Sequence, residues 1–140
     1  MTTISRPPLD FTVIREDWCR YDLEDNAILK VKMILTKVSK KGSEYQAAFQ
    51  TINVVLSNER GEPSTQTMLS QELQTSIIND HIRFTTMVQD WNEYLLDDGA
   101  RIKIQPIVMR VGKTSKFDKS GEPIYWIETQ GTLQIIPLKT

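Results

Sequence analysis

The sequence has few of the residues that cross-link small domains or hold metals. It contains one cysteine, Cys19, and one histidine, His81. A lone cysteine cannot form a disulfide within the chain, and no group of cysteines and histidines has the spacing of a zinc site. We therefore expect a fold without disulfides and without a bound metal.

The short motifs that usually carry catalysis are also missing. The sequence has no glycine-rich phosphate loop and no G-x-S-x-G nucleophile motif. Cys19 has no predictable base, and His81 follows a predicted helix, where a capping role is usual. The acidic residues at the predicted turns lack the spacing of a calcium loop. The sequence thus predicts a protein that is not an enzyme and holds no cofactor.

The chain lacks both an excess of charge and a long apolar run. It carries 17 Lys and Arg against 18 Asp and Glu, a net charge of -1. Binding through the phosphate backbone of a nucleic acid usually requires a surplus of basic residues. A transmembrane helix needs roughly 18 apolar residues, and the N-terminal residues lack the apolar core of a signal peptide. We expect a cytoplasmic protein that does not contact membranes.

What the chain does contain is one segment twice. Residues 11–40 align without a gap to residues 84–113, and 12 of the 30 positions are identical, where chance gives roughly two. Upstream, Ile4 and Leu9 align with Ile77 and Ile82. We interpret this as an internal duplication.

The duplication predicts one domain, residues 1–140, built from two repeats. Repeat one spans residues 4–56, a linker loop and helix follow over residues 57–80, and repeat two spans residues 77–136. The alternative is two separate modules, but roughly 60 residues alone would form only a marginal core.

Each repeat has the hydrophobic pattern of β-structure. Large apolar residues alternate with polar ones from Leu29 to Leu35 and from Ile102 to Val108, as in half-buried strands. Acidic turns precede these runs, and a further apolar stretch follows each of them, which predicts a three-stranded antiparallel meander. Pro106 interrupts the second run, so we expect an edge or a bulge at that position.

The linker has a different period. Leu69, Leu73 and Ile77 recur every fourth residue, Ser70 is a candidate cap, and Asn79 and Asp80 are candidate stop residues. This pattern predicts one helix of about two to three turns. The predicted fold is mainly β with one linker helix, in which two meanders form a pseudo-two-fold, six-stranded barrel or sandwich.

The strongest signature shared by the repeats is D-W-x-x-Y-x-L-x-D. It contains the candidate binding residues Trp18, Tyr21, Trp91 and Tyr94. Aromatic rings beside carboxylates are suited to binding, and a small-ligand pocket lined by Trp18 and Trp91 at the pseudo-two-fold axis is one hypothesis. We favour buried aromatic residues and turn aspartates, because a duplicated unit keeps its folding determinants.

Basic residues on the outward strand faces support a different hypothesis. Lys30 and Lys103, with Lys116 and Phe117 in the second predicted hairpin, are candidate residues for binding single-stranded nucleic acid. Lysines on such faces also keep sheets soluble.

The leading hypothesis is a non-enzymatic adaptor or assembly subunit that acts through protein contacts or self-association. Residues 112–123, expected as a long hairpin loop, and the linker residues 58–67 are the predicted contact segments.

Overall fold

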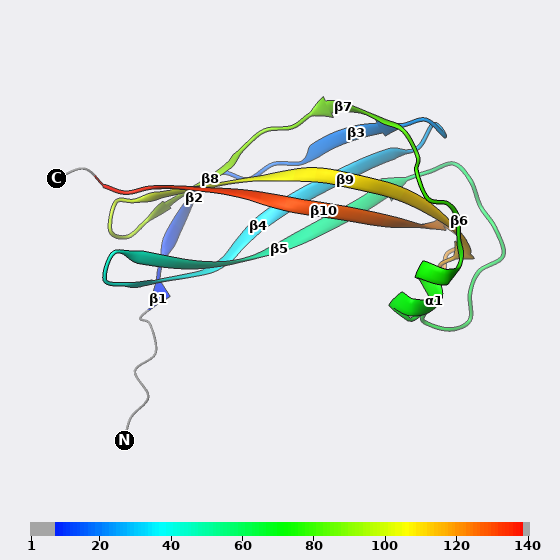
Figure 1. Cartoon of the computed structure of the whole chain (residues 1–140), viewed down its shortest axis with the longest axis horizontal. Coiled ribbons are helices and arrows are strands. Elements are labelled where there is room, and N and C mark those ends of the chain that lie inside the picture. The colour runs from blue at the N-terminus through cyan, green and yellow to red at the C-terminus, as the bar shows by residue number, and fades with distance from the viewer. Residues whose placement is uncertain (1–7, 139–140) are drawn as a thin grey trace, which may run out of the picture.

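The computed structural model describes residues 8–138, which form two five-stranded antiparallel sheets and one short helix (Figure 1). Ile4, the predicted start of repeat one, lies outside this range. The elements in chain order are β1 (Pro8–Leu9), β2 (Phe11–Arg15), β3 (Cys19–Leu23), β4 (Ile28–Lys41), β5 (Glu44–Leu56), α1 (Ser70–Thr75), β6 (Ile77–Asn79), β7 (Phe84–Val88), β8 (Asn92–Leu96), β9 (Arg101–Phe117) and β10 (Pro123–Ile136).

The two sheets have matching strand orders. One sheet runs β5-β4-β3-β7, with β1 also paired to β4, and the other runs β10-β9-β8-β2, with β6 also paired to β9. The meanders β3-β4-β5 and β8-β9-β10 are therefore present as predicted. The expectation of six strands is wrong because each sheet gains two more, and the sheets within residues 8–138 form no closed barrel.

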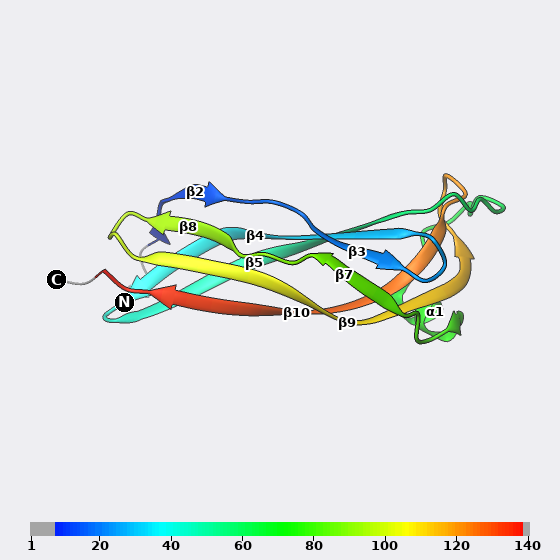
Figure 2. The same cartoon turned by 90° about the horizontal axis from the view of Figure 1, so that it is seen from above.

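Two short strands, β2 and β7, each pair with a strand from the other half of the sequence. Strand β2 precedes β3 in the chain but pairs with β8, so that Phe11 lies opposite Leu96. Strand β7 precedes β8 but pairs with β3, so that Phe84 lies opposite Leu23. Figures 1 and 2 both show β2 beside β8 at one end of the molecule and β7 beside β3 toward the other. Each sheet is thus completed by a strand from the other half of the chain.

Two clusters of buried side chains hold this arrangement together. The first contains Tyr21, Leu29 and Val31 from one sheet and Val108 and Val111 from the other. The second reverses these contributions, with residues of β8 and β9 covered by residues of β4 and β5 at the opposite end of the molecule. Burial of these apolar side chains is the main force that keeps the two sheets face to face.

The predicted alternation along the long strands is confirmed. Leu29 and Val31 in β4, like Ile102 and Ile104 in β9, are fully buried, while Lys30 and Lys103 face outward. Pro106 lies inside β9, opposite Gly131 of β10. On its other side, the pairing of β9 with β8 reaches only to Ile104, and the pairing with β6 starts only at Lys113. The proline therefore occupies a stretch of β9 with one neighbouring strand. A residue that lacks an N–H is tolerated there.

The helix is shorter than predicted. It ends at Thr75, and Ile77 already belongs to β6, so the prediction of two to three turns is wrong. Ser70 is the first helical residue, and Leu69 takes the cap position without a side-chain hydrogen bond. Within the helix Leu73 is partly covered, whereas Leu69 at the cap position is 65% exposed, and the partly covered Ile77 belongs to β6. A helix with little apolar burial has little reason to extend.

Candidate functional site

The tyrosines of the shared signature lie inside the core. Tyr21 and Tyr94 have no exposed surface, and each packs edge-to-face on a phenylalanine of the crossing strand, Phe84 and Phe11 respectively. The Tyr21 hydroxyl donates to Gln89 at 2.9 Å, and the Tyr94 hydroxyl donates to Glu16 at 2.7 Å. Burial is the main reason that the pKa of both phenols is raised. These rings are placed to hold the fold, and neither is accessible to a ligand.

Trp18 and Trp91, the two tryptophans of the shared signature, lie where the two halves of the chain cross, and both are half-buried. Near Trp18, the Asp17 N–H donates to the Asn92 side chain at 2.9 Å, and the Lys32 ammonium lies 5.2 Å from the indole centroid. Neither Trp18 nor Trp91 lines any of four hollows on the surface of the described residues. One is a shallow hollow between β3 and the start of β7, and another lies beside Arg110 and Asp80.

The basic residues do not gather into one stripe. Lys30 and Lys103 lie on the outward faces of different sheets, and those faces point away from the shared core. Several basic groups also have acidic partners: Glu93 pairs with Arg101 at 2.9 Å and with Lys103 at 3.6 Å. Arg110 pairs with Glu128 at 3.1 Å. Paired cations contribute less to the attraction of a phosphate backbone than unpaired ones.

The two predicted contact segments touch each other. Strand β9 continues to Phe117, so the expected long loop is a strand pair closed by a tight turn over residues 118–122. The linker is docked on this turn: the Gly61 N–H donates to the Gly121 carbonyl at 2.9 Å, and the Ser64 N–H donates to the Asp118 carbonyl at 3.0 Å. We call this unit, residues 57–69 with residues 112–123, the hairpin-linker end.

Phe117 is the centre of the hairpin-linker end. A Cβ atom on Gly61 would lie 2.4 Å from its ring, so only glycine permits this close approach. The ring also lines a mainly apolar hollow of about 270 Å³ with Met68 and Leu73. Lys116, the neighbouring candidate, is exposed on β9. The unit is further tied by ion pairs of Glu59 with Lys113 and of Glu122 with Arg60.

A larger open surface runs along β5 and β10. Each of these strands has a neighbour on one side only within the described residues, so each presents a free edge. They are also long, with 13 and 14 residues, whereas the edge strands β2 and β7 have five each. An unprotected strand edge offers backbone N–H and carbonyl groups to another strand.

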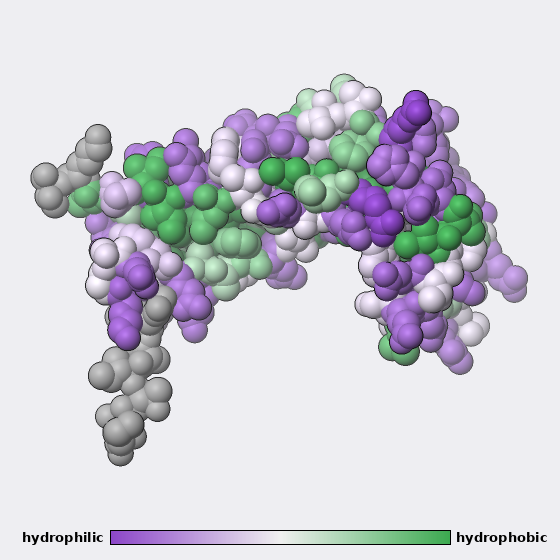
Figure 3. All heavy atoms as spheres, in the orientation of Figure 1, coloured by the Kyte–Doolittle hydropathy of each residue, from purple (hydrophilic) through white to green (hydrophobic). Residues whose placement is uncertain are grey.

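Apolar side chains on β5 and β10 are exposed although they lie on the core-facing sides of these strands. Phe49 lies opposite Leu35 and is 37% exposed, and Leu133 lies opposite Ile104 and is 41% exposed. In Figure 3, apolar surface gathers over the C-terminal half of β10 and the adjoining part of β5. The core is therefore open along this side of the molecule, which we call the open side.

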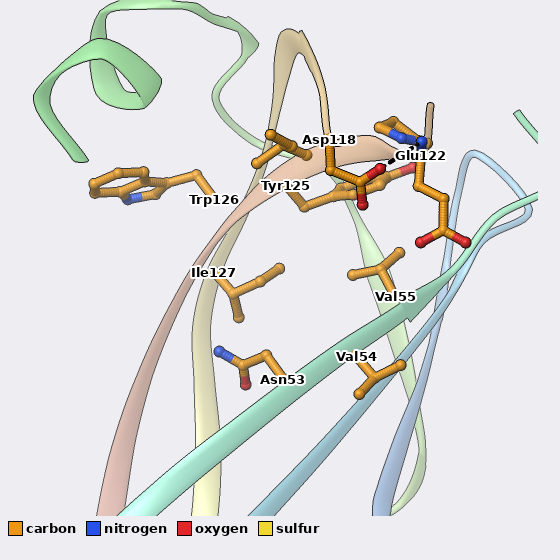
Figure 4. Close-up of a pocket in the computed structure, with 10 residues that line it drawn as sticks. Asn53, Val54, Val55, Asp118, Glu122, Tyr125, Trp126 and Ile127 are labelled. Carbon is orange, nitrogen blue, oxygen red and sulfur yellow. Dashed lines mark hydrogen bonds between the residues drawn. The ribbon is translucent and has the colours of Figure 1, made fainter. Parts of the chain in front are cut away.

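The open side contains a hollow of about 530 Å³ between the end of β5 and the start of β10. Figure 4 shows Asn53 and Val55 across from Tyr125 and Ile127, with the Asp118 carboxylate at the upper rim and Trp126 turned away. The Asp118 carboxylate accepts the Glu122 N–H at 2.9 Å, so it is already used to shape the turn.

Sequence reasoning missed this surface, although one signal for it was present. No charged residue occurs from Tyr45 to Leu56, and β10 contains a single one, Glu128. Charged side chains are the usual protection of a free edge. Their absence marks these two strands more clearly than the aromatic and basic residues that the sequence first suggested.

Within residues 8–138, no helix is long and apolar enough to cross a bilayer, and no cluster of three or more potential metal ligands occurs. Cys19 is a buried free thiol, and burial is the main cause of its raised pKa. The chain matches no protein family model, and comparison with curated proteins and with solved structures finds no match.

Proposed function

We propose that this chain is a non-enzymatic subunit of a protein assembly and that it makes its contacts through the open side. The observation that carries this proposal is the pair of long, free and nearly uncharged edges of β5 and β10. Pairing with a strand of another chain would satisfy the backbone groups of these edges and cover the exposed apolar side chains.

The architecture that we propose is a duplicated, open-sided sandwich with a pseudo-two-fold axis. It is supported by the matching strand orders of the two sheets and by the crossed exchange of β2 and β7. It is supported further by equivalent polar contacts, because Tyr45 reaches Asp98 of repeat two while Tyr125 reaches Asp25 of repeat one. Such a frame places two equivalent long edges on one molecule.

Absolute mass by light scattering on a sizing column, with absorbance at 260 and 280 nm across the same peak, tests the assembly function. We expect a mass above 16.2 kDa, or a stable complex with a second protein when the chain is purified from its source, and no excess absorbance at 260 nm. Co-elution with nucleic acid and binding that weakens steeply with added salt would contradict it.

A further inference from the structure

We infer that β5 pairs in antiparallel fashion with β5 of a second copy of this chain, so that two copies form a dimer joined edge to edge. This inference rests on the proposed function and specifies its partner. It is carried by three properties of β5: a free edge without charge from Tyr45 to Leu56, pairs about Gln50 that contain no like charges, and exposed apolar side chains.

The first property is that the free edge is unprotected. Natural sheets blunt exposed edges with lysine, proline, bulges or short length, and these devices act first against pairing of the protein with itself. The free edges of β2 and β7 are short, at five residues each. Strand β5 has 13 residues, and neither a charge nor a proline occurs from Tyr45 to Leu56. Every copy of the protein therefore presents an edge that another copy can extend.

The second property is self-complementarity. Gln50 is the middle residue of β5, so a two-fold axis at this position places Gln50 of one copy opposite Gln50 of the other. Phe49 then faces Thr51, and Tyr45 faces Val55, without any like-charge pair between residues 45 and 55. The two Phe49 rings become diagonal neighbours, within reach of each other at about 7–8 Å. A two-fold interface needs this kind of match with itself.

The third property is apolar surface that the pairing would cover. Phe49 and Val54 are each 37% exposed, and Leu56 is 49% exposed. Strand β10 also has a free edge, but it contains Glu128, which is paired with Arg110 and accepts from the Trp126 indole. Strand β5, which has no charged residue from Tyr45 to Leu56, is therefore the better candidate for pairing with itself.

A charge-swap experiment at Gln50 tests this pairing. Gln50 is exposed on the outward face of β5, opposite Ile34, so a charged side chain fits the monomer. We expect the natural chain to be a dimer, and we expect both Gln50→Lys and Gln50→Glu to raise its dissociation constant at least about tenfold, because like charges meet at the axis. Mixing the two variants should restore the dimer.

The matched control is Thr12→Lys, which places the same charge on β2, an edge strand that this interface does not use. We expect it to leave the dimer intact, and circular dichroism of each variant reports whether it folds. Restoration in the mixture also shows that both variants are folded, because misfolded chains would not pair.

Three outcomes overturn this inference while leaving the assembly function standing. One is a natural chain that is monomeric at its highest soluble concentration yet binds another protein. The second is an oligomer that neither Gln50 variant weakens, and the third is a pair of weakened variants that mixing does not restore. Co-elution with nucleic acid instead of protein would overturn the assembly function itself.

Discussion

Two tyrosine hydroxyls join the halves of the chain at its surface. The Tyr45 hydroxyl donates to the Asp98 carboxylate at 2.5 Å, and the Tyr125 hydroxyl donates to Asp25 at 2.6 Å. Lys40 adds an ion pair to Asp98 at 3.2 Å. Each carboxylate also accepts a backbone N–H two residues on, so each closes its own turn while holding a hairpin of the other repeat.

The sequence predicted only half of this role. Asp25 and Asp98 were expected as turn residues because they precede Asn26 and Gly99, and both of these residues have the positive φ of such turns. Their tyrosine partners are 100 and 53 residues away. A local pattern contains no information about contacts at such separations, so the sequence did not predict that either tyrosine binds a turn aspartate.

The contacts of Asp98 predict a pH-dependent stability. Burial opposes ionisation of Asp98, but hydrogen bonds from Tyr45 and from the Ala100 N–H outweigh it and lower the pKa below 3.8. The folded state therefore favours the carboxylate. Its stabilisation is complete above pH 3.8 and is lost as the pH falls through the folded-state pKa.

We expect Asp98→Asn to lower the free energy of unfolding by about 1 kcal/mol at neutral pH, since Asp98 is partly exposed. Urea denaturation at a series of pH values should show the difference from the natural chain shrinking below pH 3.8. Asp97→Asn, in the same turn but exposed, is the control and should change stability little. A difference that stays constant down to the lowest pH would count against this role.

Among the elements, the long strands were predictable and the short crossing strands were not. Strands β4 and β9 alternate strictly over residues 28–35 and 101–108, because one face of each is buried there. In β2 and β7 only the first residue, Phe11 or Phe84, is partly covered, and the next four residues are exposed. Without alternation there is no signal of period two, and these strands form because a partner strand from the other repeat is present.

The packing of the hairpin-linker end depends on the glycine at position 61. Gly61→Ala would place a methyl group 2.4 Å from the Phe117 ring, and the ring or the linker must move. We expect the linker to loosen and trypsin to cleave after Arg60 several-fold faster than in the natural chain, because cleavage follows local opening. Limited proteolysis followed by mass spectrometry measures this rate.

The matched control is Gly42→Ala in the turn between β4 and β5. The positive φ of Gly42 strains that turn, but its Cβ would meet no atom within 4 Å, so the linker should stay in place. Equal cleavage after Arg60 in both variants would show that Phe117 does not hold the linker.

At the scale of the whole molecule, the exchange of β2 and β7 holds the two halves together through strand pairing, in addition to the covalent linker between them. Strand β2 of the first half belongs to the sheet of the second, and β7 of the second half belongs to the sheet of the first. We expect the chain to stay together after its linker is cut at a protease site inserted beside Gln66. The cut protein should elute at the mass of the intact chain and separate only in denaturant.

Separate elution of the two fragments without denaturant would show that the exchanged strands contribute little. A cut in the turn between β9 and β10 is a useful comparison, because it divides neighbouring strands of one sheet and should also leave the mass unchanged.

The exchanged strands also set an order on synthesis. Strand β3 has β4 on one side, but its other partner, β7, begins only at Phe84. On the ribosome, the first sheet therefore stays incomplete until more than half of the chain has emerged. Until then the apolar faces of β3 and β4 are uncovered. We expect the nascent first half to expose unpaired strand edges during this interval, and slow translation before residue 84 to prolong that exposure.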